Sequence, residues 1–561
     1  MPVIEVLFND LQRLVKADLP RNLAELTDIL SYVKGEAVSL EEDALSIEIK
    51  DGNRPDLWCV EGIARELKGA LGVEEGLREY VVKGFSGISM EVDPRLENIR
   101  PFIGCAVVKE VHLTSEVIRE LMHLQDKLDQ TYGRRRRRAS IGLYNLGLIT
   151  PPLQFNVAKP EDVSFVPLGG EVEMNLREIV ESHPKGIEYG HLVKKHERWP
   201  ILRDSKEKVL SIPPIINSNN LGKISEGEED IFVEVTGTDY RTVLNTLKIV
   251  TLSLADRGEE IFSTQVRYHY GEERVVSTPN LSVKEVRLDL NYVNQILGLS
   301  LKVDMVLKLL KRARYNVRWS GGSSIEVTVP CYRMDVMHQL DIIEDVAIMY
   351  GYNNLKPRWP QQITFGKISD FEAFSDTTRE VMTGLGFQET LSFSLSNEEQ
   401  LFRKMNLRGE KAVELLNPTS LRFTCLQSWL IPSLMDFLSK NTHVEYPQRI
   451  FEVGDCVVPD KASETGVQNV RKLACLITHS NSNFSEVKAS LNAFSINMGF
   501  KHQLFESTHK SFIEGRVGTI FVQEKQVGIV GEINPLILEM WGLVNPVTGF
   551  EVNLSTLMNA T

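Results

Sequence analysis

The chain has 561 residues, which at about 150 residues per domain predicts three or four domains. It carries 63 Lys and Arg against 76 Asp and Glu, a formal net charge of −13, and 42% of its residues are hydrophobic. This composition is typical of globular proteins and excludes a disordered, fibrous or disulfide-scaffold chain. No run approaches the roughly 18 apolar residues of a membrane span, and Glu5 and Asp10 interrupt any secretory signal. We therefore expect a soluble, cytoplasmic chain with no membrane partner.

The first two predicted domains cover residues 1–83 and 84–275. In the first, residues 44–49 alternate like a half-buried strand, and apolar spacing predicts a helix over 57–71. The second is expected to be an α/β domain with the following elements: strands at 103–111, 209–217 and 230–239, a helix at 115–128 capped by Ser115, and a helix at 242–255.

Two further domains are predicted over residues 276–356 and 360–561. In the smaller one we expect a helix from Asp304, its N-cap, to 313, a hairpin formed by 316–319 and 325–329, and a helix over 339–350. The last domain is predicted as α+β, with these elements: helices at 370–385 and 431–439, strands at 389–395 and 449–454, and a hairpin over 518–531.

Four carboxylates near the end of the small domain form a candidate metal site. Asp341, Glu344 and Asp345 lie at i, i+3 and i+4, so a helix places them on one face, and Asp335 precedes them. An oxygen-only ligand set suits a hard cation such as Mg²⁺. The alternative is a solvated acidic face with Arg333 as a local counter-ion.

An uninterrupted run of five arginines is the most basic segment of the chain. It consists of Arg134, Arg135, Arg136, Arg137 and Arg138. Such a run can bind phosphate through charge-assisted hydrogen bonds, or it can be a localisation signal or a solvated loop. The pI of about 5.5 argues against indiscriminate binding to nucleic acid but leaves a local basic surface open.

Glu234 interrupts an apolar strand. Alternation places it on one face with Phe232 and Thr236, opposite the face of Ile231, Val233 and Val235. A carboxylate there must pair, hydrogen-bond or face water. It either accepts a ligand's hydroxyl proton in a pocket or is a solvent-facing glutamate of an edge strand.

Other common catalytic and metal signatures are missing from the sequence. The six cysteines form no CxxC motif, and isolated cysteines are typical of buried positions in a reducing compartment. His191 and His196 are interpreted as surface residues, and there is no HExxH, Walker-type or GxGxxG motif.

Several segments together resemble the β subunits of phenylalanyl-tRNA synthetases, in the right order over nearly the whole chain. They are 53–56 (NRPD) with 62–66 (GIARE), 212–217 (IPPIIN) with 235–239 (VTGTD), 330–353 (PCYRMDVMHQLDIIEDVAIMYGYN), 417–420 (NPTS), 430–432 (LIP) and 449–454 (RIFEVG). The resemblance, which is to the archaeal and eukaryotic branch, implies an N-terminal module, an editing domain, a small DNA-binding-like module and a domain like the class II synthetase catalytic fold.

In this family the four-carboxylate pattern is a Mg²⁺ site, so the resemblance implies that Asp335, Asp341, Glu344 and Asp345 are its ligands. The last domain is expected to be inactive, because the segment that should carry an ATP-binding arginine reads VGIVGEINPL at 527–536, with no arginine after Arg516. The resemblance therefore implies that an α subunit binds ATP and activates phenylalanine, in a complex of two α and two β chains. Gln427 stands where the family usually has arginine, which puts an interface contact in doubt.

The resemblance also implies hydrolytic editing of Tyr-tRNA. Residues expected around the pocket are Leu202, Ser211, Asn217, Glu234, Thr236 and Thr238. Glu234 is the candidate for the tyrosine hydroxyl, while Asn217 and Thr236 are candidates for orienting water or the ester carbonyl. The arginine run becomes a candidate tRNA contact. The alternatives are a tRNA-binding scaffold that lacks editing and a freestanding aminoacyl-tRNA hydrolase.

Overall fold

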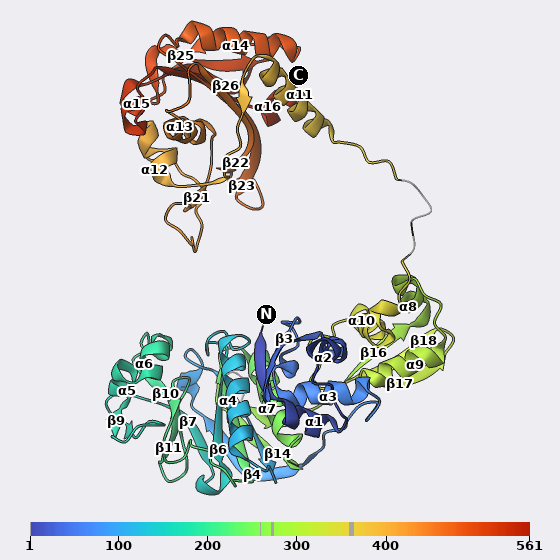
Figure 1. The fold of residues 1–561 in the computed structure, drawn as a ribbon. Helices are drawn as coiled ribbons and strands as arrows, with labels where there is room; N and C mark the ends of the chain where they lie inside the picture. The colour runs from blue at the N-terminus through green and yellow to red at the C-terminus, as the bar shows by residue number, and fades with distance from the viewer. Residues whose placement is uncertain (1, 259, 271–273, 358, 360–363, 561) are drawn as a thin grey trace. The chain divides into compact units, whose positions relative to one another are not determined.

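The structure is a computed structural model that describes residues 2–258, 260–270, 274–357, 359 and 364–560 (Figure 1). The chain divides into two compact units, residues 1–358 and 359–561. Both units mix helices with sheets, in agreement with the predicted α+β multidomain class. Within the described ranges, no helix has both the length and the apolar character that crossing a membrane requires.

The first unit begins with a small antiparallel sheet of order β1-β3-β2. Its elements are β1 (Val3–Leu7), β2 (Gly35–Glu41), β3 (Ala44–Ile49), α1 (Phe8–Val15), α2 (Leu23–Leu30) and α3 (Val60–Ala70). The strand predicted over 44–49 is confirmed. The helix predicted from residue 57 begins only at Val60, because Pro55–Leu57 forms a separate 3-10 turn and Cys59 is extended.

A ten-stranded mixed sheet forms the centre of the first unit, in the order β12-β11-β10-β7-β4-β14-β5-β13-β6, with β15 beside β14. Its strands are β4 (Val82–Val92), β5 (Phe102–Lys109), β6 (Ala139–Asn145), β7 (Leu153–Ala158), β10 (Trp199–Arg203), β11 (Val209–Ile212), β12 (Ile216–Asn217), β13 (Ile231–Gly237), β14 (Glu260–Tyr268) and β15 (Arg274–Thr278). The strand predicted over 209–217 is thus two strands, β11 and β12, separated by the Pro213–Pro214 segment.

Two long helices, α4 (Ser115–Gln130) and α7 (Tyr240–Ala255), pack on this sheet (Figure 1). The predicted alternation of β13 is confirmed, because Ile231, Val233 and Val235 join the hydrophobic cluster of the two helices, whereas Phe232 joins the cluster on the other face. The prediction of Ser115 as the cap of α4 is wrong. Thr114 is the N-cap, and its hydroxyl accepts a hydrogen bond from the Val117 amide.

A third sheet, of order β16-β18-β17, lies in the small module that ends the first unit. Its elements are β16 (Lys284–Asp289), α8 (Leu290–Leu297), α9 (Val303–Arg312), β17 (Asn316–Gly321), β18 (Ser324–Val329) and α10 (Gln339–Tyr350). The predicted hairpin and the helix over 339–350 are confirmed. Asp304 is not the cap of α9; it lies in the first turn, where its charge suits the helix dipole, and Lys302 occupies the cap position.

The second unit contains a seven-stranded sheet of order β19-β22-β23-β27-β26-β25-β24, antiparallel except for the β19–β22 pair. Its strands are β19 (Gln388–Glu389), β22 (Gln448–Pro459), β23 (Val467–Thr478), β24 (Gln503–Glu506), β25 (Phe512–Val522), β26 (Lys525–Ile533) and β27 (Val547–Asn553). Its longer helices are α11 (Asp370–Gly384), α13 (Ile431–Lys440) and α14 (Phe484–Asn497). The strand predicted over 389–395 is wrong, since only its two ends pair and Leu391 and Phe393 between them are exposed.

A buried charge cluster joins the N-terminal elements to the large sheet. Arg257, whose side chain is 2% exposed, follows α7 and binds Asp10 of α1 at 2.7 Å, Glu120 of α4 at 2.6 Å, and Glu61 of α3. Burial raises the pKa of Glu120 to about 8, against the opposing charge of Arg257. The single guanidinium therefore holds three carboxylates that the fold removes from water.

We expect Arg257→Met to destabilise the full chain by about 3–5 kcal/mol, because three buried carboxylates lose their cation. The loss should shrink as pH falls from 8 to 5, since Glu120, whose pKa burial raises to about 8, is then protonated and no longer needs the cation. Thermal unfolding measures the effect, with Arg267→Met as the control, because Arg267 is exposed and its ion pair with Glu91 is long, at 3.6 Å. Equal melting temperatures for the two variants would contradict the assignment.

Candidate functional site

A cavity of about 600 Å³ lies between α4, β6 and the segment 211–224 of the large sheet. Three of the six residues predicted for a pocket, Ser211, Asn217 and Glu234, line it. The antiparallel pairing of β11 with β12 places Ser211 directly opposite Asn217. Glu234 comes from β13, which is hydrogen-bonded to β5 on one side and β6 on the other. The alternative of a solvent-facing glutamate on an edge strand is therefore wrong.

Glu234 is 3% exposed and has only one of its two oxygens satisfied. The hydroxyl of Tyr144 lies 3.1 Å from Glu234 Oε1 and 3.3 Å from Asn217 Oδ1, and its single proton can serve one of them at a time. Glu234 Oε2 has no partner, nor does the buried Ser211 hydroxyl. Burial raises the pKa of Glu234 to about 7, although the Tyr144 hydrogen bond and the nearby charge of Arg100 both favour ionisation.

A side chain at residue 142 would crowd the buried groups of Tyr144 and Glu234. Gly142 pairs with Glu234 across β6 and β13, and a Cβ there would lie 2.5 Å from the Tyr144 hydroxyl and 2.6 Å from Glu234 Oε1. Any other residue would force the Tyr144 ring or the Glu234 carboxylate to shift. Neither Gly142 nor Tyr144 was among the residues predicted for the pocket.

The other three predicted pocket residues lie elsewhere. Leu202 is buried in the hydrophobic cluster on the pocket side of the sheet, and the hydroxyl of Thr236 accepts a hydrogen bond from Arg100 Nε at 2.8 Å. Thr238 is exposed and donates to the Arg137 carbonyl at 3.0 Å. None of the three is among the residues that line the 600 Å³ cavity.

The arginine run forms the turn between α4 and β6, with left-handed φ angles at Arg134, Arg135 and Arg136. The residues Arg134, Arg135, Arg137 and Arg138 are exposed. Arg136 instead turns inward and lines the cavity; its Nη1 donates to the Ile215 carbonyl at 2.9 Å, and its Nε lies 2.8 Å from Asp129 Oδ2. One member of the run is thus part of the pocket wall.

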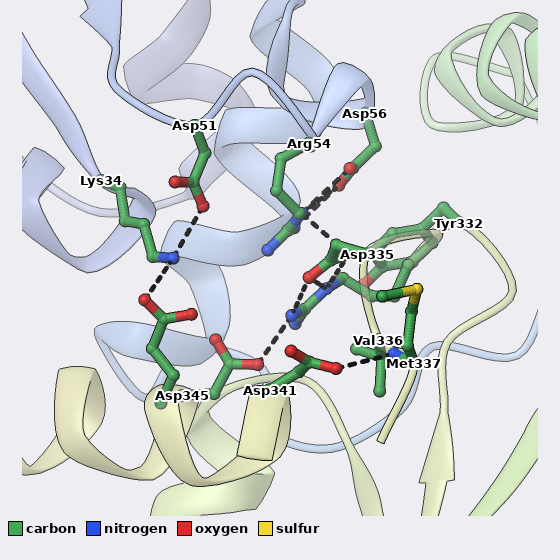
Figure 2. Close-up of polar contacts among 12 residues, drawn as sticks. Lys34, Asp51, Arg54, Asp56, Tyr332, Asp335, Val336, Met337, Asp341 and Asp345 are labelled. Atoms are coloured by element: carbon green, nitrogen blue, oxygen red, sulfur yellow. Dashed lines mark hydrogen bonds and ion pairs between the residues drawn. The ribbon is translucent and has the colours of Figure 1, made fainter. Parts of the chain in front are cut away.

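The four carboxylates of the candidate metal site are all engaged by groups of the protein itself (Figure 2). Arg333 Nη2 lies 2.7 Å from both Asp335 and Asp345, and Lys34 lies 2.9 Å from Glu344. Asp341 accepts from the amides of residues 337 and 338 at the start of α10. Although burial opposes it, the Arg333 guanidinium lowers the pKa of Asp335 to about 2.

In this arrangement the four carboxylates do not fit a Mg²⁺ site. Mg²⁺ requires ligand oxygens that converge on one point. Here the carboxylates of Asp335 and Asp345 instead face the guanidinium of Arg333, whose side chain is 3% exposed. Within the part of the chain that the structure describes, no three or more His, Cys, Asp or Glu side chains are placed to hold a metal ion. Magnesium binding by these residues stays a prediction.

Comparison with known proteins agrees with this architecture. A phenylalanine–tRNA ligase β subunit of Pyrococcus abyssi is 41% identical over 561 residues, covering 99% of this chain and 100% of the relative. The β subunit of Archaeoglobus fulgidus is 39% identical, covering 100% of this chain and 99% of that relative. This chain belongs to the phenylalanine–tRNA ligase β-subunit family.

Domain models and a solved structure support the same family. Residues 356–554 match the phenylalanyl tRNA synthetase beta chain CLM domain, and residues 286–352 match the tRNA synthetase B5 domain. A crystal structure of an N-terminal fragment of the phenylalanyl-tRNA synthetase β subunit from Pyrococcus horikoshii aligns with a TM-score of 0.60 and 38% identity. The alignment covers 63% of this chain and 100% of the fragment.

For this β subunit we expect Arg333→Ala to lower the free energy of unfolding by about 3–5 kcal/mol in EDTA, because Asp335 and Asp345 lose their shared cation. Thermal unfolding of the full chain measures this, with exposed Arg318 as the control position. Titrating Mg²⁺ in the same experiment tests the metal prediction. That prediction requires a Mg²⁺-dependent rise in melting temperature that Glu344→Ala abolishes, and an unchanged rise would contradict it.

Proposed function

We propose that this chain, as the β subunit of a phenylalanine–tRNA ligase, assembles with an α subunit, contributes to tRNA binding and hydrolyses Tyr-tRNA in the Glu234 pocket. The observation that carries the editing proposal is the buried carboxylate of Glu234, whose Oε2 has no partner and whose residue lines a cavity of about 600 Å³. A buried acceptor without a partner is costly, and a ligand donor would remove that cost.

Tyrosine and phenylalanine differ by the hydroxyl that such an acceptor recognises. An apolar pocket excludes an added hydroxyl poorly, so an activation site selects phenylalanine over tyrosine incompletely. A second site that binds the hydroxyl selects in the opposite direction, because a phenylalanyl ester would leave Glu234 Oε2 unpaired. Hydrolysis at this pocket would therefore remove the error and spare the correct product.

The groups that would act on the ester are those that lie beside Glu234. Ser211 and Asn217 face each other across β11 and β12, and the Ser211 hydroxyl has no partner of its own. We assign these two residues to orienting water or the ester carbonyl. Thr236, which the sequence suggested for this role, is engaged by Arg100 and Ser140 instead.

The proposal places phenylalanine activation in the α subunit, which would bind ATP with the Mg²⁺ that this ligase family uses, in a complex of two α and two β chains.

The exposed apolar side chains of the second unit support binding of a partner chain. They include Leu391, Phe393, Leu416 and Leu421, at 90%, 77%, 94% and 87%. Clusters of this kind mark protein interfaces, since water is a poor solvent for them.

The exposed members of the arginine run are proposed to contact tRNA. Arg134, Arg135 and Arg138 project from a turn whose backbone is fixed by hydrogen bonds back to α4, so their positions are restricted. A chain with net charge −13 would then bind RNA through local basic patches, in a salt-dependent manner.

A scaffold subunit without editing and a freestanding hydrolase are the two alternatives. The unpartnered Glu234 carboxylate favours editing over the scaffold, because a scaffold gains nothing from a buried acceptor. Co-purification with an α chain separates the ligase subunit from a freestanding hydrolase.

We expect Glu234→Ala in the assembled ligase to lower kcat/KM for Tyr-tRNA deacylation by about 10–100-fold, since the hydroxyl contact is worth about 1–3 kcal/mol. Glu234→Gln keeps the shape and one acceptor and should show a smaller loss. Glu181→Ala, an exposed glutamate of the same unit, is the control. Wild-type deacylation by Glu234→Ala would remove Glu234 from the mechanism.

Discrimination should depend on pH. Because the pKa of Glu234 is raised to about 7, the carboxyl is protonated below that pH and becomes the stronger, ionised acceptor above it. The ratio of Tyr-tRNA to Phe-tRNA deacylation should rise between pH 6 and pH 8 and level off above pH 8. Glu234→Gln should show no such rise, and a rise of equal size in that variant would exclude Glu234 as its source.

A further inference from the structure

A second cavity, of about 310 Å³, lies behind the wall of the Glu234 pocket. Pro214 lines both cavities, and the neighbouring residues Arg136 and Arg137 line one each. Thr238, which was predicted to lie in the editing pocket, lines this second cavity instead. The turn that carries the arginine run and the Pro213–Pro214 segment therefore separate two adjacent spaces.

The second cavity is positively charged. Arg100, Arg137 and Lys195 line it, and Glu97 is the one acidic residue among its lining residues. The side chains of Arg137 and Lys195 are exposed and form no hydrogen bond or ion pair with the residues that the structure describes. They are free to bind an anion.

Arg100 is the unusual member of this set, because it is buried without a carboxylate. It is 3% exposed, and its guanidinium donates to neutral oxygens: the Thr236 hydroxyl and carbonyl, the Ser140 hydroxyl, and the carbonyls of Arg136 and Arg137. No described Asp or Glu lies within ion-pair distance of it, and burial lowers its pKa to about 10. Buried charges are normally paired, so an anion in the adjoining cavity would supply what the protein leaves out.

We propose that this cavity binds a phosphate group of the RNA strand, next to the aminoacylated nucleotide whose ester occupies the Glu234 pocket. The inference rests on the editing function proposed above. Arg137 and Lys195 would bind the phosphate directly. The buried guanidinium of Arg100 would add positive charge at the base of the cavity, and it donates a hydrogen bond to the Arg137 carbonyl. A volume of about 310 Å³ suits a group of the size of one nucleotide, the lower end of the range for small-ligand sites.

This arrangement gives the adjacent arginines different roles. Arg137 binds the strand, whereas Arg136 is a positioning residue, because it holds the carbonyls of Pro214 and Ile215 in the wall between the cavities. Loss of Arg137 should weaken binding. Loss of Arg136 should disturb the geometry of hydrolysis.

The test uses two small substrates with the assembled ligase: the tyrosyl ester of adenosine and the tyrosyl ester of adenosine 5′-phosphate. They differ only in the phosphate that the second cavity would bind. We expect wild type to hydrolyse the phosphorylated ester with a KM about tenfold lower, in line with one phosphate contact of about 1–2 kcal/mol. Lys195→Ala and the double variant Arg137→Ala/Lys195→Ala should progressively remove this advantage with little change in kcat.

Lys194→Ala is the matched control, because Lys194 is the exposed neighbour of Lys195 and does not line the cavity. It should retain the full advantage of the phosphorylated ester. Arg136→Ala should lower kcat for both esters, and Arg136→Lys should restore part of it. Adding adenosine 5′-phosphate or inorganic phosphate shows whether a free anion competes as well as the ester's own phosphate does.

The outcomes separate this inference from the proposed function. If the wild-type enzyme hydrolyses neither ester and also leaves Tyr-tRNA intact, the editing function itself is overturned. Hydrolysis of both esters with equal KM, or an advantage that survives in the double variant, would overturn the phosphate site alone. Equal loss in Lys194→Ala and Lys195→Ala would also overturn it, because the effect would then be general charge.

Discussion

Strand β13 is held by hydrogen bonds on both sides, and this constraint fixes the chemistry of the first unit. Glu234 is opposite Cys105 in one neighbour and Gly142 in the other, so its carboxylate cannot swing out to water. The protein gives it one hydroxyl and leaves one oxygen unpartnered. Other parts of the site can be understood from that restriction, including the missing side chain at residue 142 and the buried guanidinium nearby.

Buried arginines organise the rest of the first unit. Arg257 joins helices from separate segments around three carboxylates, and Arg333 lies between two carboxylates of the small module. Arg136 ties a turn to the pocket wall. A planar cation with five donors suits these positions, because it can satisfy several acceptors at fixed angles, which a lysine cannot do.

Alternation and helical spacing were enough to predict many of the elements, among them β3, β13, the β17–β18 hairpin and α10. The 389–395 segment has the composition of a strand and still fails, because its apolar side chains are exposed and most of its backbone does not pair. Composition cannot distinguish residues that the fold buries from residues left on a surface. The caps of α4 and α9 failed for a related reason, since several neighbouring polar residues could serve and only the local backbone decides.

The site was predicted in part. Glu234 stood out because a carboxylate in an apolar strand needs an explanation, and Ser211 and Asn217 came through the family resemblance. Tyr144 and Arg100 were missed, and Arg136 was assigned to tRNA and not to the pocket wall, because their roles depend on contacts between segments far apart in the chain, such as the 136 residues that separate Arg100 from Thr236. The run of five arginines looked uniform in the sequence, and only its three-dimensional position shows that Arg136 differs from the others.

Under the proposed editing function, a single mutation at Gly142 would be enough to impair proofreading. An alanine there needs only one nucleotide change in any glycine codon, and its methyl group would sit against Tyr144 and Glu234 while β6 keeps its backbone pairing. If the pocket edits as proposed, the cost of this allele would be tyrosine incorporated at phenylalanine codons, most severely when the supply of phenylalanine runs low.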